Sequence, residues 1–289
     1  MSDVPGGPTP PPPPPPPPPM MGGPQGSIPP KTLGEILSAA FNIYKANASK
    51  LLVIVAIVVV PLTFISTLLS SVVFDPGTTR IVVLGRPVDA PNGRGIFMVL
   101  FVGAIGAAIS VIIWAVLEAA IMRAAAQATI GDPVDTEASY RYGFKRLGSV
   151  ILVSLLVGLA VLGGLILLII PGLIFLGLLS VSIPALIVEN LRGTQAMGRS
   201  WNLVKGHFWH AVGVIIVAGI ITGFIGGIIG AIGGNAWIGR WIFTSIATVI
   251  TAPFSALVSV LLYLDLRARS EALSADTLRS ELAAAGSAG

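Results

Sequence analysis

The chain has no cysteine, and charged residues make up only 10% of its 289 positions. Without cysteine it can form no disulfide, no thiolate metal site and no cysteine nucleophile. Soluble proteins carry about 25% charged residues, so most of this chain cannot present its surface to water. A hydrophobic fraction of 54% and a mean hydropathy of +0.90 instead predict an integral membrane protein.

The chain also lacks the motifs of common hydrolases and nucleotide-binding enzymes. It contains no Gly-x-Ser-x-Gly, no His-Glu-x-x-His and no phosphate-binding glycine loop. Its two histidines, His207 and His210, lie three residues apart with no carboxylate close by in the sequence, so we expect neither a metal site nor a cofactor. No polar stretch is long enough to fold as a catalytic domain. We therefore expect that the protein is not an enzyme.

Residues 1–30 have the composition of a tail rather than of a folded domain. Pro10 to Pro19 are ten consecutive prolines, and proline has no N–H and a fixed φ, so this run can form neither helix nor sheet. We expect a disordered, proline-rich cytosolic tail. It either binds a proline-binding protein or serves as a solvated spacer. A signal peptide begins with a positively charged segment that an apolar one follows. The polar start of this tail has no such pattern, so no cleavable signal peptide is expected.

Six long apolar segments predict an all-α fold, a polytopic bundle of six transmembrane helices. The first has 24 residues without a charge, which is about 36 Å of helix. Residues 149–188 are uncharged over about twice the length that a bilayer needs, and Pro171-Gly172 is expected to divide them. The predicted spans are 51–74, 96–122, 149–170, 173–188, 208–232 and 241–264. They form a membrane domain over 31–268, which a cytosolic tail of 269–289 follows.

The distribution of lysine and arginine predicts the orientation. Of the 17 lysine and arginine residues, 13 lie near the N-terminus, in the loops 123–148 and 189–207, or near the C-terminus. The other four lie in the intervening connections on the opposite side. Because cytoplasmic loops are enriched in these residues, both termini are expected in the cytoplasm. The same bias explains the net charge of +4, so we expect no nucleic-acid partner.

Three segments that precede the first, third and fifth spans each place an aromatic residue four positions before a base. The pairs are Phe41 and Lys45, Tyr142 and Arg146, and Trp201 and Lys205. One helical turn apart, the ring can lie at headgroup depth while the cation reaches lipid phosphate. We expect all six residues to be interfacial anchors. The pattern indicates either an internally repeated fold or the common composition of cytoplasmic loops.

Two further interfacial features flank the spans. Thr32 and Glu35 have the spacing of a capping box, which predicts a short amphipathic helix before the first span. Asp265 and Arg267 follow the last span directly, and we expect them to be interfacial anchors as well.

Glu118 is the one acidic residue well inside a predicted span. A charge at the centre of a bilayer costs about 2.5–3.5 kcal/mol. Glu118 either binds a proton or a cation inside the bundle, or lies near the cytoplasmic interface and pairs with water or Arg123. The second explanation is favoured because Arg123 is only five residues away.

The fifth span carries two rows of glycines with a spacing of four. They are Gly219, Gly223 and Gly227, and Gly226, Gly230 and Gly234. In lipid, helices associate where small residues allow their backbones to approach. We therefore expect these rows to pack against another span or against a second copy of the chain, which would make the protein a homo-oligomer.

Three segments resemble a known family. They are 32–52, Pro184–Glu189 continued by Ser200–Trp209 (SWNLVKGHFW), and Tyr263–Arg269 (YLDLRAR). They are similar to the bacterial membrane-domain family named after glycerophosphoryl diester phosphodiesterases, and the resemblance covers about residues 30–272. It implies a six-helix, multi-pass domain of the bacterial plasma membrane that is often found without a catalytic partner.

Two functions are compatible with these features. The first is a non-catalytic scaffold, which binds membrane lipid and a protein partner. The alternative is a small transporter or channel for a lipid-like or small amphipathic solute. An accessible Glu118 in a cavity would favour transport, whereas a filled bundle with a free proline-rich tail would favour scaffolding.

Overall fold

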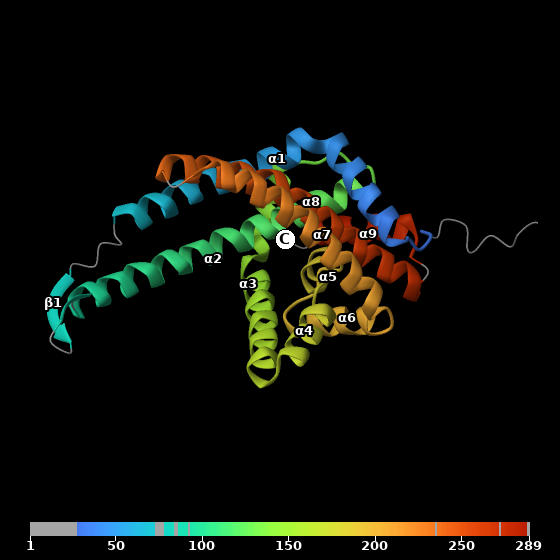
Figure 1. Cartoon of the computed structure of the whole chain (residues 1–289). Coiled ribbons are helices and arrows are strands. Elements are labelled where there is room, and N and C mark those ends of the chain that lie inside the picture. The colour runs from blue at the N-terminus through green and yellow to red at the C-terminus, as the bar shows by residue number, and fades with distance from the viewer. Residues whose placement is uncertain are drawn as a thin grey trace, which may run out of the picture.

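The structure is a computed structural model. It describes the backbone of residues 28–72, 78–83, 86–91, 93–234, 236–271 and 273–287, and side chains within 28–65 and 110–284 except at positions 235, 272 and 275. Six helical segments are long and apolar enough to cross a membrane: Leu33–Ile65, Ser110–Thr129, Thr136–Leu167, Ile169–Val188, Phe208–Ile232 and Trp237–Glu271. The predicted all-α bundle and its six spans are confirmed (Figure 1). Most of the predicted proline-rich tail, residues 1–27, lies outside the described residues.

Helix α1 (Leu33–Val72) begins at the predicted capping box. The Thr32 backbone N–H donates to Glu35 Oε2 at 2.7 Å, and the Glu35 N–H donates to Thr32 Oγ1 at 3.4 Å. The helix bends at Asn47, whose φ of −119° and ψ of 16° are not helical. The amphipathic segment and the first span are therefore two parts of one kinked helix, and Figure 1 shows the change of direction between them.

The connection predicted over residues 75–95 contains a β-hairpin. Strand β1 (Thr78–Val83) pairs antiparallel with β2 (Arg86–Pro91), with Val83 opposite Arg86. Helix α2 (Gly93–Thr129) follows and is continuous past the predicted end of its span. The predicted extent of the loop, residues 123–148, is consequently wrong. Between α2 and the next helix, only residues 130–135 are not helical.

Helices α3 (Thr136–Leu167) and α4 (Ile169–Leu178) form the predicted hairpin, but the chain breaks at Leu168 (φ −162°, ψ 148°) rather than at Pro171-Gly172. Pro171 lies in the first turn of α4, where a backbone N–H has no acceptor within the helix. A Cβ at Gly172 would lie 2.4 Å from Leu165 Cγ. The first turn of α4 thus tolerates the proline. The glycine allows α4 to pack closely against α3.

Five more helices follow in the described part of the chain. They are α5 (Ser182–Val188), α6 (Thr194–Lys205), α7 (Phe208–Ile232), α8 (Trp237–Glu271) and α9 (Ala275–Ser287). The first span packs against the last. Tyr44 donates its hydroxyl hydrogen to the Ile250 carbonyl at 3.2 Å, and Trp241 Nε1 donates to the Val60 carbonyl at 3.1 Å. Helices α1 and α8 are therefore antiparallel neighbours.

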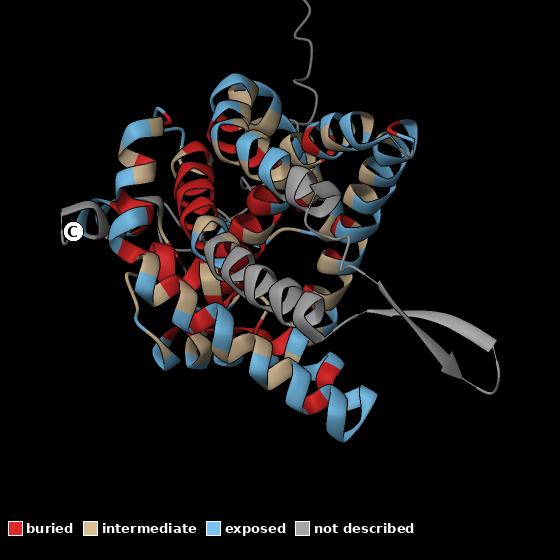
Figure 2. Ribbon diagram, turned by 90° about the vertical axis from the view of Figure 1, so that its left-hand side faces the viewer, coloured by how far each residue is buried: buried red, intermediate tan, exposed pale blue. Residues whose placement is uncertain are grey.

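Buried residues gather where the end of α2, the start of α3, α5 and the second half of α8 meet, and Figure 2 shows them in red at the centre of the molecule. Ala119, Ala120, Ala124 and Ala125 of α2 are fully buried there. The end of α3, by contrast, exposes large apolar side chains, and Ile166 is 84% exposed. So much exposed apolar surface is not stable in water, which agrees with a location in lipid.

Candidate solute-binding site

Glu118 lines a cavity of about 590 Å³ between α2, α3, α4, α5 and α7. Ser154 and Gly158 contribute from α3, and Ser180 contributes from the segment after α4. The remaining wall is apolar: Val157, Val161, Leu162, Leu176, Leu179, Ile183 and Ile215. Small-molecule sites in proteins have this volume and this combination of apolar walls with a few polar groups.

The cavity exists because α3 is held against its neighbours at its two ends. Near its start, a Cβ at Gly143 would lie 2.7 Å from the Val116 carbonyl oxygen of α2. Near its end, a Cβ at Gly164 would lie 2.8 Å from Gly172 of α4. Between these contacts, a Cβ at Gly158 would meet no atom within 4 Å. The middle of α3 therefore leaves space in front of Glu118.

Two polar groups in the cavity wall have no partner among the described residues. Glu118 is half-buried, and no described residue makes a hydrogen bond or an ion pair with it. The Ser180 hydroxyl is buried without a hydrogen bond. Buried polar groups are nearly always hydrogen-bonded, so the missing partner is unusual for the Ser180 hydroxyl. The Glu118 carboxylate is not fully buried and is free to contact a molecule in the cavity.

Arg123 does not pair with Glu118, so this part of the favoured explanation is wrong, whereas contact of the carboxylate with interfacial water stays a prediction. Its guanidinium carbon lies 4.5 Å from the centroid of the Tyr142 ring, and its Nη2 donates to the Leu282 carbonyl at 3.3 Å. Arg123 itself is only 8% exposed. The arginine thus joins α2 to α3 and α9, and the carboxylate faces the cavity.

The predicted interfacial anchors divide into two groups. Phe41 and Trp201 are 53% and 40% exposed, and Lys45 and Lys205 are exposed too, as an interfacial role requires. For Tyr142 and Arg146 the prediction is wrong, because they are 5% and 6% exposed. The Tyr142 hydroxyl donates to the Ile187 carbonyl at 3.0 Å, so this aromatic–base pair packs α3 against α5.

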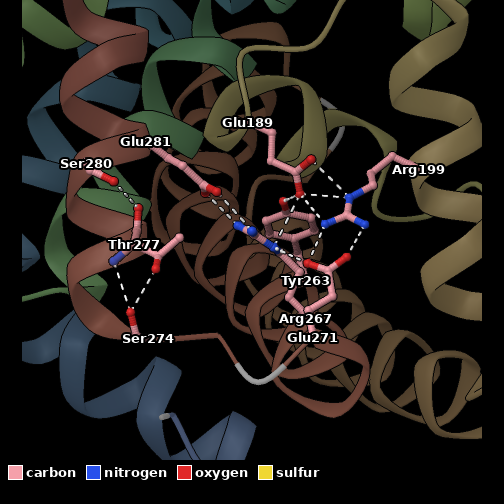
Figure 3. Close-up of polar contacts among 9 residues, drawn as sticks. All are labelled: Glu189, Arg199, Tyr263, Arg267, Glu271, Ser274, Thr277, Ser280 and Glu281. Carbon is pink, nitrogen blue, oxygen red and sulfur yellow. Dashed lines mark hydrogen bonds and ion pairs between the residues drawn. The ribbon is translucent and has the colours of Figure 1, made fainter. Parts of the chain in front are cut away.

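Asp265 and Arg267 are also buried, at 3% and 5% exposure, so they are not interfacial anchors. Arg267 Nη1 donates to Glu281 Oε2 of α9 at 2.6 Å. Figure 3 shows the network around it, in which Glu189 accepts a hydrogen bond from the Tyr263 hydroxyl and Arg199 bridges Glu189 and Glu271. Hydrogen bonds to Glu271 and Glu189 raise the pKa of Arg199 above its ordinary value.

The network of Glu189, Arg199, Tyr263, Arg267, Glu271 and Glu281, here called the ion network, joins α5, α6, α8 and α9. Each of its carboxylates is paired, so it offers no vacant ligand position. The arrangement is that of a structural clamp. Of its residues, the sequence pattern indicates a site role for Arg267 alone, as an interfacial anchor.

Asp265 forms a second buried pairing. Its carboxylate accepts hydrogen bonds from the Lys31 backbone N–H at 2.5 Å and from Arg269 Nε at 2.8 Å, and it lies 3.0 Å from His210 Nε2. It thereby connects the segment before α1 to α7 and α8. Across the described part of the chain, no three histidine, aspartate or glutamate side chains gather in a group that could hold a metal ion.

The glycine rows of α7 make no close contact with the described residues of the chain. A Cβ placed at Gly219, Gly223, Gly226, Gly227, Gly230 or Gly234 would meet no described atom within 4 Å. Close packing of these positions against a described residue of the same chain is therefore not found, and packing against another span stays a prediction only for the parts of the chain whose side chains lie outside the described residues. Packing against a second copy stays a prediction.

No family model, curated protein or solved structure matches the chain. The functional assignment therefore depends on the geometry. One carboxylate and one hydroxyl without partners, in an apolar cavity within the predicted membrane spans, can bind the polar end of a small molecule and enclose its apolar part.

Proposed function

We propose that the protein is a transporter or channel for a small amphipathic solute, and that the Glu118 cavity is its binding site. The observation that carries this proposal is the unpaired Glu118 carboxylate beside the unpaired Ser180 hydroxyl in a cavity of about 590 Å³. A scaffold needs no such cavity. The proposal therefore follows the alternative function rather than the leading one.

The carboxylate specifies the kind of solute. An ionised carboxylate away from water is costly unless a positive charge or a proton compensates it. Since no arginine or lysine of the described chain pairs with Glu118, the compensating charge would come from the solute. The proposed solute is a small organic cation whose apolar part contacts Val157, Val161 and Leu176.

Ethidium, an amphipathic cation, tests the proposal. We expect Glu118→Gln to weaken ethidium binding to the purified protein about tenfold or more, because a charge-assisted contact is lost, and to slow ethidium flux into proteoliposomes. The melting temperature should stay unchanged, since the amide has nearly the same shape. Glu137→Gln, on the exposed first turn of α3, is the matched control.

A second pair of variants tests the cavity itself. Gly158→Leu should fill the cavity and reduce binding, whereas Gly148→Leu on the same helix should not. At both glycines a Cβ meets no atom within 4 Å, but only Gly158 lines the cavity. Wild-type binding and flux in both Glu118→Gln and Gly158→Leu would contradict the proposal.

The scaffolding hypothesis and the family resemblance stay predictions. The proline-rich segment on which scaffolding depends lies almost wholly outside the described residues. The resemblance agrees with six spans, and we propose on the quoted segments alone that the chain is a bacterial plasma-membrane protein. The Glu118 site depends on neither.

A further inference from the structure

A second hollow lies between α1, α7 and α8 and shares no residue with the Glu118 cavity. It is a groove of about 410 Å³. Six of the residues that line it are large and apolar: Leu37, Phe41, Ile221, Ile225, Ile250 and Phe254. This set of residues is called the α1 groove below.

Most of the hydroxyl groups in the α1 groove are satisfied by the protein. Tyr44 donates to the Ile250 carbonyl at 3.2 Å, Thr222 donates to the Ala218 carbonyl at 2.9 Å, and Thr251 donates to the Ala247 carbonyl at 2.8 Å. The walls thus present methyl and ring surface and need no polar partner. An occupant that fits them is a hydrocarbon chain.

The positively charged side chain of Lys45 lies at the edge of the α1 groove. Lys45 Nζ lies 5.3 Å from the centroid of the Phe41 ring, and Phe41 is part of the groove wall. Lys45 is exposed, and no acidic side chain of the described residues forms an ion pair with it. A negatively charged group bound there would lie within reach of the lysine while an attached chain entered the groove.

We propose that the α1 groove binds one acyl chain of an anionic phospholipid, and that Lys45 binds the phosphate of that lipid. The bilayer supplies molecules with this combination of chain and charge. Lysine attracts anionic headgroups by about 1 kcal/mol for each residue near the surface. The Phe41 ring would separate the chain below it from the phosphate above it, which is the arrangement common at membrane interfaces. This site is independent of the solute site.

Native mass spectrometry of the full chain tests this proposal. The protein is released from detergent after incubation with phosphatidylglycerol or with phosphatidylcholine that has the same acyl chains. We expect the wild type to retain one phosphatidylglycerol in preference to phosphatidylcholine. Lys45→Gln should weaken phosphatidylglycerol binding about fivefold and remove the preference. Lys50→Gln is the matched control, because Lys50 is exposed on the same helix but does not contact Phe41.

The groove is tested separately from the lysine. Ile225→Trp should fill the α1 groove and reduce the binding of both lipids, whereas Ile228→Trp, at a 50% exposed position outside the groove, should leave it unchanged. Equal losses for Lys45→Gln and Lys50→Gln would show nonspecific annular lipid only and overturn the proposal. Unchanged lipid binding in Ile225→Trp would also overturn the proposal. So would the formation of dimers as lipid is removed, because a second copy of the chain would then occupy the groove.

Discussion

Arg267 is 5% exposed, and three carboxylates surround it. Its side chain lies 2.6 Å from Glu281 and 3.3 Å from both Glu189 and Glu271. Removing one member of a buried ion pair leaves the other charge without compensation, which costs about 3–5 kcal/mol. The ion network is therefore expected to be sensitive to single substitutions.

We predict that Arg267→Met lowers the free energy of unfolding by about 3 kcal/mol, near the lower end of that range because Glu281 is partly open to water. The methionine keeps most of the apolar stem, so the change isolates the charge. The measurement is the melting temperature of the purified protein in mild detergent. Arg279→Met is the control, since Arg279 is 54% exposed and its ion pair with Asp276 is worth about 0–1 kcal/mol. Equal melting temperatures for the two variants would contradict the prediction.

At the scale of the helices, the glycines at which two helices pack closely are not the ones with the most regular spacing. Gly143 of α3 belongs to no row of glycines spaced by four, yet a side chain there would meet the Val116 carbonyl at 2.7 Å. Gly223 belongs to a row of three in α7, and a Cβ there would meet no described atom within 4 Å. Close packing depends on which face meets a neighbour, and spacing alone does not specify that face.

We predict that Gly143→Ala destabilises the protein by about 1–3 kcal/mol, because α2 and α3 must move apart. Gly223→Ala should be neutral or slightly stabilising, since alanine is the better helix former. Thermal unfolding in detergent compares the two. A similar loss of stability in Gly223→Ala would mean that α7 packs against a second copy of the chain.

The sequence predicted the helices better than the connections between them. Apolar length alone is sufficient to identify six spans, because each must cross the same hydrocarbon thickness. The capping box at Thr32 and Glu35 also formed as predicted, since all its contacts lie within four residues. The hairpin of β1 and β2 was missed, although the β-branched run Ile81-Val82-Val83 is typical of strands.

The sites were predictable only in part, because their partners are distant in the sequence. Glu118 stood out as a lone charge in a span, but its separation from Arg123 depends on Tyr142 and Leu282, which lie on other helices. Ser180 gave no signal at all. Asp265 and Arg267 were assigned to the interface because nothing local shows that α7 and α9 supply their partners.

At the scale of the whole molecule, the orientation can be tested because the chain has no native cysteine. A cysteine at Thr79, in β1, should react with an impermeant thiol reagent in intact cells. A cysteine on the C-terminal helix should react only after lysis. Asp276, whose side chain is 96% exposed, suits the second position better than Ser274, whose hydroxyl accepts the Thr277 N–H at 3.1 Å. Labelling in the reverse order would show that both termini are outside.

The pairing of α1 with α8 has a consequence for biosynthesis. Tyr44 and Ile250 are 206 residues apart. A ribosome that adds about 5–20 residues per second synthesises Ile250 about 10–40 s after Tyr44. Throughout that interval the nascent first span resides in the bilayer without its principal neighbour, and lipid or the insertion machinery must cover the face that α8 will occupy. The first helix to be inserted is thus among the last to gain its packing neighbour. A stop codon before Trp237 would release a chain in which that face of α1 stays uncovered.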